Sequence, residues 1–141
     1  MIDIESKVVD TIFNAVTAVY PNADVTTGFD NKTAVFPCVV VEEVENTPFR
    51  RTATDDCSEN HTRVGYEVSV YTVNFNSAKT EGKKIIELVD TALAGLKFRR
   101  IRKNQPLNVA RNLFRQYGRW EVIVGKPTVS GEDTVYQMYR R

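Results

Sequence analysis

Apolar and polar side chains alternate along residues 64–73. Successive side chains of a strand point to opposite faces, so the alternation predicts a strand with one buried face. Four apolar residues share that face: Val64, Tyr66, Val68 and Val70. After a turn at residues 74–77, apolar residues recur at helical spacing from Ala78 to Leu96, which predicts an amphipathic helix. A strand and a helix of this kind bury one shared core.

The same two patterns predict the other elements. Helical spacing predicts a first helix from residue 3 to about residue 20, which Pro21 and Asn22 end. Further strands are predicted at Ala23–Thr27, Phe36–Glu45, Asn112–Val124 and Thr134–Arg140. A turn at Ser130–Asp133 makes the last part of the sequence a hairpin, and Gly118 is expected to mark a bulge or bend.

Two connections have no periodicity. The Asn46–Asn60 loop joins two predicted strands over roughly 15 residues, which is longer than most connections. Residues 97–106 are basic and irregular. The element order α-β-β-β-α-β-β predicts one α+β domain, residues 1–141. We expect a mainly antiparallel β-sheet with two α-helices packed on one face, and the long loop between two central strands.

Composition narrows the class of protein. The sequence is 42% hydrophobic and 26% charged, which is typical of a soluble globular domain. No apolar run approaches the roughly 20 residues that span a bilayer, so no membrane partner is expected. The two cysteines, Cys38 and Cys57, are too few for a disulfide framework. We expect a protein made in the cytosol, with both thiols reduced.

Residues that carry chemistry are scarce. His61 is the single histidine, and a nucleophile at Cys57 would have to lie within its reach. The spacing of Cys38, Cys57 and His61 fits no zinc-ligand pattern. Adjacent carboxylates such as Glu42 and Glu43 point to opposite faces of a strand, so they form no catalytic pair by themselves. The sequence therefore predicts no enzyme activity, no metal and no cofactor.

Charge is distributed unevenly along the sequence. The segment 97–119 holds no acidic residue and eight basic ones: Lys97, Arg99, Arg100, Arg102, Lys103, Arg111, Arg115 and Arg119. Because the net charge of the whole sequence is +1, the other residues sum to −7. Three interpretations stay open: a phosphate-binding patch, a surface that meets an acidic patch on another copy of the protein, and an ordinary solvated surface.

The long loop carries a second candidate contact surface. Phe49 lies beside Arg50 and Arg51, and an aromatic residue next to arginines is common at protein interfaces. The candidate interface residues are therefore Phe49, Arg50, Arg51, Arg99, Arg100, Arg102 and Lys103. A loop that only connects two strands is the alternative for Phe49 and its neighbours.

Several short segments follow one another in an informative order: Tyr20–Ala23, Phe36–Glu43, Ser58–His61, Tyr66–Tyr71, Lys79–Leu96, Arg119–Ile123 and Tyr139–Arg141. In this order they resemble the tail terminator proteins of long-tailed bacteriophages, also called tail completion, tail-to-head joining or minor capsid proteins. The resemblance covers nearly the whole sequence, and each segment is structural. It brings no catalytic residue.

The resemblance implies a virion protein of the phage tail or neck that is assembled in the host cytoplasm. Such a protein forms a homo-oligomeric ring of six copies at the head-proximal end of the tail tube. It contacts the tail tube protein, ends tube growth and presents a surface to the head–tail connector. Double-stranded DNA then passes non-specifically through the ring. Because arginines in the channel would hold phosphates tightly, we expect a neutral or acidic lumen.

Two alternatives remain beside the tail terminator. One is a head-closure or stopper ring protein, a neighbouring component of similar size. The other is a nucleic-acid-binding module that uses the basic segment 97–119.

Overall fold

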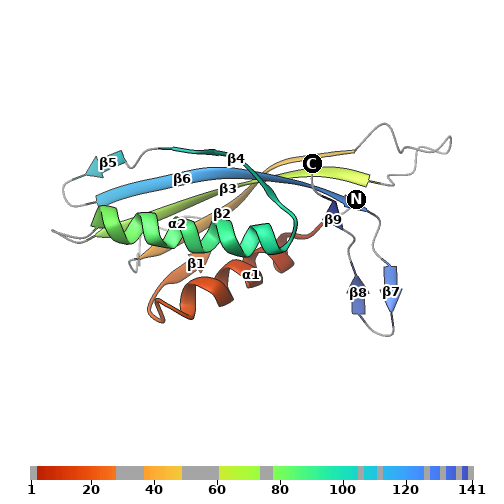
Figure 1. Cartoon of the computed structure of the whole chain (residues 1–141), viewed down its shortest axis with the longest axis horizontal. Helices are drawn as coiled ribbons and strands as arrows, with labels where there is room; N and C mark the ends of the chain where they lie inside the picture. The colour runs from red at the N-terminus through yellow and green to blue at the C-terminus, as the bar shows by residue number, and fades with distance from the viewer. Residues whose placement is uncertain are drawn as a thin grey trace.

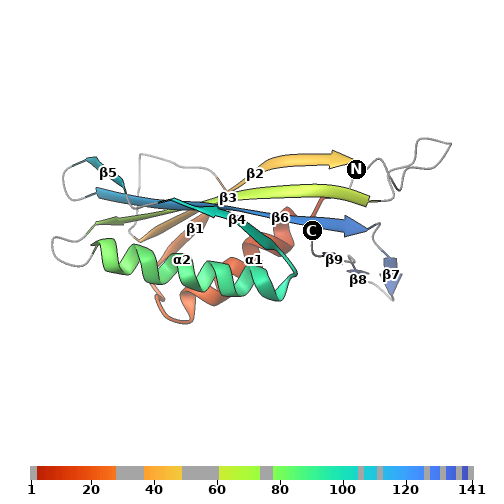
Figure 2. The ribbon, with the colours of Figure 1, turned by 45° about the horizontal axis from the view of Figure 1, so that its top comes forward.

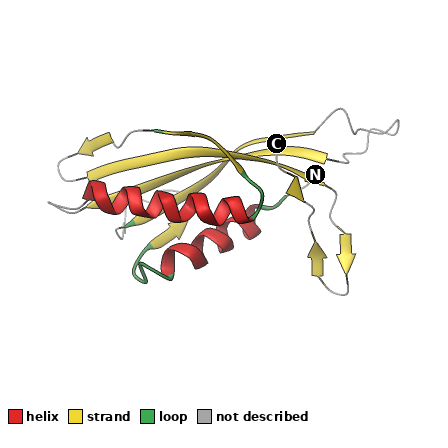
Figure 3. Ribbon diagram, in the orientation of Figure 1, coloured by secondary structure: helices red, strands yellow, loops and turns green. Residues whose placement is uncertain are grey.

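A mostly antiparallel sheet forms the framework of the fold (Figure 1). The computed structural model describes residues 3–27, 37–48, 61–73, 78–104, 107–110, 113–125, 128–130, 133–135 and 138–139. The elements in chain order are α1 Glu5–Thr17, β1 Asp24–Thr26, β2 Cys38–Pro48, β3 His61–Val73, α2 Ala78–Gly95, β4 Arg99–Lys103, β5 Leu107–Ala110, β6 Leu113–Gly125, β7 Thr128–Ser130, β8 Asp133–Val135 and β9 Met138–Tyr139. The predicted α+β class with a mainly antiparallel sheet is confirmed (Figure 3).

The strand order in the sheet is β1-β2-β3-β6-β4, and β5 and β9 also pair with β6. β1 is parallel to β2, and the other pairs in the sheet are antiparallel. β3 pairs with one edge of β6 along the whole length of both strands. β5, β4 and β9 therefore occupy successive parts of the other edge of β6. The predicted terminal hairpin forms between β7 and β8, whereas the last predicted strand divides into β8 and β9.

Both helices lie on the same side of the sheet in the two views (Figures 1 and 2). The side chains between them and the sheet form one buried cluster. α1 contributes Val8, Ile12 and Val16, and α2 contributes Ile85, Val89 and Leu93. The sheet contributes Val39, Val41, Val64, Tyr66, Val68, Val70, Trp120, Val122 and Val124. No helix in the described part of the chain has the length and apolar character needed to cross a membrane.

The strand before the long loop is longer than predicted. β2 continues to Pro48, where its pairing with β3 ends at Thr62. The buried Thr62 hydroxyl lies 2.9 Å from Asn46 Oδ1 and 3.0 Å from the Thr47 carbonyl oxygen, which accounts for the extension. The remainder of the predicted loop, including Phe49, Arg50 and Arg51, lies outside the described residues.

The prediction of an irregular segment at 97–106 is wrong, because β4 forms inside it. Lys97 ends α2 in the left-handed region, with φ 67°. Lys97 N–H donates to the Ala94 carbonyl oxygen and Phe98 N–H to that of Leu93, both at 3.0 Å. These bonds and the burial of Phe98 against the core define a Schellman motif. The motif turns the chain back toward β6, and pairing with β6 then makes a strand of a sequence without strand periodicity.

Of the predicted bulge or bend at Gly118, the bulge is absent from the pairing of β6 with β3. β6 pairs with β3 in continuous register through Gly118, which lies opposite Val68. A Cβ atom at Gly118 would lie 2.8 Å from Trp120 Cη2 and 2.9 Å from the Arg102 carbonyl oxygen. Glycine is therefore required because the Trp120 ring and the β4 backbone fill the space where a side chain would be.

Candidate functional site

The basic segment divides between the two faces and one edge of the sheet. All five residues of β4 are exposed, four of them basic: Arg99, Arg100, Arg102 and Lys103. Arg115 and Arg119 lie on β6, on the face away from the helices, here called the outer face. Arg111 lies outside the described residues. The basic residues of this segment that the structure describes thus form no single surface.

Arg119 is part of an ion-pair row on the outer face. Its Nη2 atom lies 2.9 Å from Glu45 Oε2 on β2 and 3.2 Å from Glu121 Oε1 on its own strand. Glu121 is only 5% exposed. A buried carboxylate is costly without a cation beside it, so the guanidinium of Arg119 offsets the desolvation of Glu121.

Arg115 lies on the same face of β6, four residues before Arg119, and is also paired with a glutamate. Its Nη2 atom donates to Glu67 Oε1 at 3.1 Å and to Ser69 Oγ at 3.0 Å. Its guanidinium carbon also lies 4.3 Å from the centre of the Tyr117 ring, which is cation–π geometry. The charges of Arg115 and Arg119 are therefore neutralised within the subunit, which removes them from the predicted basic patch.

The β4 residues alternate between the two faces. Arg99 and Arg102 lie opposite Glu121 and Arg119, on the outer face, whereas Arg100 and Lys103 lie opposite Trp120 and Gly118, on the helix face. Ile101 lies at the register shift between Arg100 and Arg102 and is 42% exposed. β4 is consequently an edge strand that presents cations to both sides of the sheet.

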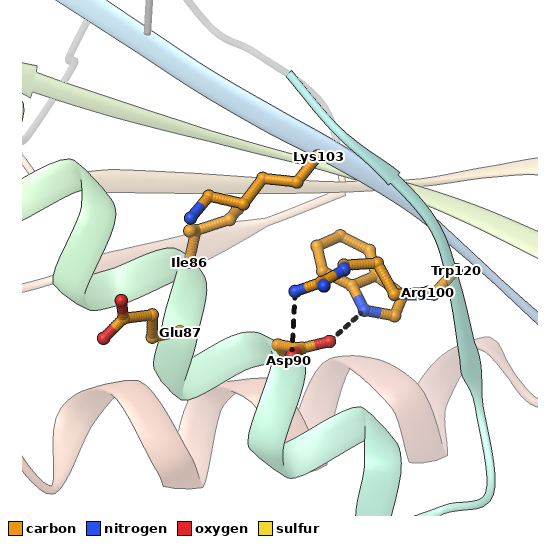
Figure 4. A pocket seen from close by; sticks show the side chains of 6 residues that line it. All are labelled: Ile86, Glu87, Asp90, Arg100, Lys103 and Trp120. Carbon is orange, nitrogen blue, oxygen red and sulfur yellow. Dashed lines mark hydrogen bonds and ion pairs between the residues drawn. The ribbon is translucent and has the colours of Figure 1, made fainter. Parts of the chain in front are cut away.

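On the helix face, β4 is linked to α2 through Asp90 (Figure 4). The Trp120 indole N–H donates to Asp90 Oδ1 at 2.9 Å, and Arg100 Nη1 lies 3.3 Å from Asp90 Oδ2. Ile86, Glu87 and Lys103 complete the lining of a small pocket here, with a cavity volume of about 20 Å³. Small-molecule sites usually measure roughly 300–1,000 Å³. These contacts position β4 against α2, and no local sequence pattern predicts them.

The opposite edge of the sheet is acidic. β1 pairs only with Cys38–Val40, so beyond Val40 no described strand pairs with the free edge of β2. Glu42 and Glu43 are exposed there. Val44, at the register shift between Glu43 and Glu45, is 42% exposed. The sequence predicts no catalytic pair at Glu42 and Glu43, and the repetition of glutamate along one strand is the signal by which the charged edge could have been found.

Glu43 combines exposure with an acidic neighbourhood. Its Oε1 atom accepts hydrogen bonds from Asn46 Nδ2 at 3.2 Å and from the Tyr66 hydroxyl at 3.3 Å. Partial burial raises the pKa of Glu43 above its ordinary value, and the negative charges of Asp3 and Glu5 raise it further. The beginning of α1 therefore adds to the negative potential at this edge.

Reactive groups are sparse in the described residues. Within those ranges, no three His, Cys, Asp or Glu side chains are arranged to hold a metal ion. Cys38 is a buried free thiol. Burial raises the pKa of the Cys38 thiol, and the charge of Asp24 raises it further, so its thiolate form is disfavoured. Cys57 lies outside the described residues.

The candidate site is thus a pair of sheet edges, a basic edge (β4) and an acidic edge (residues 42–45 of β2), with exposed Ile101 and Val44 at their register shifts. Comparison of the sequence with protein-family models gave no match, and comparison with curated proteins gave none either.

Proposed function

We propose that this protein is a structural subunit of a ring in the tail of a long-tailed bacteriophage. Six copies close the ring at the head-proximal end of the tail tube, end its polymerisation and join it to the head connector. DNA passes through the lumen. The protein acts by binding copies of itself and other virion proteins, without catalysis, in the host cytoplasm and then in the virion.

The observation that supports this proposal best is the opposite charge of the two sheet edges. A ring is built by heterologous contacts, in which each subunit offers two different, complementary surfaces. The basic edge at β4 and the acidic edge at residues 42–45 of β2 are two such surfaces on one small domain. The order of the sequence segments, which resembles that of tail terminators, supports a phage tail as the assembly in which the ring is built.

A nucleic-acid-binding module is the second candidate, and the exposed cations of β4 favour it. Arg99, Arg100, Arg102 and Lys103 are exposed together on one strand. Against it, Arg115 and Arg119 are paired with glutamates, and Arg100 is paired with Asp90. Binding to duplex DNA that weakens steeply with salt, and that is lost when Arg99, Arg100 and Arg102 become alanine, would favour this candidate.

The first experiment measures the mass of the purified protein by light scattering and images it by negative-stain electron microscopy, alone and mixed with tail tubes. Rings, free or capping tube ends, are the expected result. Protein that stays monomeric in both samples, or that turns over a small molecule, would contradict the proposal.

A second experiment separates the terminator from a head-closure or stopper ring. Loss of the terminator should leave tail tubes of excessive length. Loss of a stopper should instead leave tails of normal length that are not attached to heads. Electron microscopy of lysates from a phage lacking this gene distinguishes the two outcomes.

A further inference from the structure

We propose that neighbouring copies in the ring associate edge to edge, with β4 of one subunit pairing along residues 42–45 of β2 of the next. The sheet then continues from subunit to subunit. The inference rests on the proposed function only in taking the partner to be a second copy of this chain, and it assigns the two strands that meet.

Strand direction allows this pairing without turning the neighbour over. β2, β3, β6 and β4 each run antiparallel to the strand beside them, so β4 runs opposite to β2 (Figure 2). A copy placed beside the first in the same orientation therefore brings β4 against β2 as an antiparallel pair. In such a pair the backbone hydrogen bonds run perpendicular to the strands, and the ladder is slightly more stable per residue than a parallel one.

The charges lie at the same level of the sheet on both edges. Three rows of paired residues cross the four strands: Glu45–Gly65–Glu121–Arg99, Glu43–Tyr66–Trp120–Arg100 and Glu42–Glu67–Arg119–Arg102. Each row therefore begins with a glutamate on β2 and ends with an arginine on β4. Continuing the rows into the next subunit places every edge glutamate opposite an edge arginine.

The faces also match. Glu45 bonds to Arg119 on the outer face, and Arg99 shares that face at the end of the same row. Glu43 accepts from Tyr66 on the helix face, where Arg100 contacts Asp90. Cβ atoms of directly opposed residues in an antiparallel pair lie about 4.5–5.5 Å apart, so opposite charges on one face interact.

The same charges disfavour the other ways of pairing these edges. Two basic edges would bring Arg99, Arg100 and Arg102 against their own copies, and two acidic edges would oppose glutamates, with Asp3 and Glu5 nearby. Charged side chains and bulges are the usual protection of an edge strand against indiscriminate pairing. The heterologous pairing of β4 with β2 instead places opposite charges across the junction, and a heterologous contact is the kind that closes a ring.

The test exchanges one charge pair, Glu42 and Arg102, which belong to one row. No ion pair within the subunit is described for either side chain, so the exchange leaves the interior unchanged. E42R and R102E should each elute as the 16.0-kDa monomer at concentrations where the wild type forms rings. The E42R/R102E double variant, and an equimolar mixture of the two single variants, should regain rings, since every junction again joins opposite charges.

A cross-linking experiment tests the register directly. In a C57S background, E42C/R102C should form disulfide-linked chains of subunits on oxidation, because the two positions lie opposite each other across the junction. E42C/K103C is the matched control: Lys103 lies on the helix face, one residue from Arg102, and should not cross-link.

The outcomes separate this inference from the proposed function. Rings that form equally well from E42R and from R102E, or equal cross-linking in the control, would overturn the edge pairing and leave the ring function standing. A wild type that forms no ring, alone or with tail tubes, would overturn both.

Discussion

Replacing Gly118 by alanine should destabilise the protein strongly, although the substitution only replaces one hydrogen atom with a methyl group. Gly118 lies on the helix face of β6, between the Trp120 ring and the β4 backbone. A methyl group would lie 2.8 Å from Trp120 Cη2 and 2.9 Å from the Arg102 carbonyl oxygen. Carbon atoms in good contact are about 3.5–4.0 Å apart, so both neighbours would have to move.

Neither neighbour moves easily. Trp120 is among the largest fully buried side chains, and its indole is held by Asp90 at 2.9 Å. The Arg102 carbonyl belongs to the backbone of β4, which pairs with β6. Overpacking of a well-packed core typically costs about 1–3 kcal/mol. With a backbone atom and a fixed indole as the obstacles, we expect G118A to cost about 2–3 kcal/mol of unfolding free energy.

Urea unfolding followed by Trp120 fluorescence measures this cost, at a concentration and salt at which the protein is monomeric. G82A is the matched control. A Cβ atom at Gly82 on α2 would meet its nearest neighbour, Thr72 Oγ1, at 3.5 Å, which is ordinary contact. Alanine also favours the helix by up to about 1 kcal/mol, so G82A should be neutral or stabilising. A G118A variant as stable as the wild type would refute the reasoning.

Three further predictions concern stability measured in the same way. K97G should stabilise the protein by about 1 kcal/mol, since Lys97 adopts φ 67°, which glycine occupies without strain; an unchanged midpoint would contradict this. R119M should cost about 1–3 kcal/mol, because it removes the cation that lies 3.2 Å from the buried Glu121 carboxylate. R102M on exposed β4 should change stability by under about 0.5 kcal/mol, and equal costs for the two variants would be the contrary result. E43Q should be more stable than the wild type at neutral pH. The raised pKa of Glu43 means that the folded state binds the proton more tightly than the unfolded state does, so proton binding stabilises the fold. This stabilisation by the proton is present below the ordinary pKa of 4.5 and is lost as the pH rises through the raised pKa. The stability difference should therefore close on acidification below pH 4.5, and a difference independent of pH would contradict the cause.

Local periodicity identified the elements whose pattern reflects a single buried face. The four residues assigned to the inner face of the strand at 64–73, namely Val64, Tyr66, Val68 and Val70, are fully buried in β3. The helix predicted from Ala78 to Leu96 is α2, ending one residue earlier. These predictions succeed because the alternation of a strand and the turn of a helix are set by residues a few positions apart.

Edges and charge pairs depended on contacts between distant parts of the chain. The segment Arg-Arg-Ile-Arg-Lys of β4 carries no strand pattern, and it forms a strand because the free edge of β6 supplies its hydrogen-bond partners. The role of Gly118 depends likewise on the ring of Trp120 and on the backbone of β4.

The count of basic residues in 97–119 was evident from the sequence, whereas their partners were not. Arg115 pairs with Glu67, 48 residues away, and Arg119 with Glu45, 74 residues away. Sheet register determines such pairs, because it decides which side chains lie opposite each other on one face. The sequence by itself thus determined the class of fold, the core faces and the amount of charge. Only the tertiary structure decided which cations are neutralised internally and which remain on an open edge, because strand pairing joins residues that no local pattern relates.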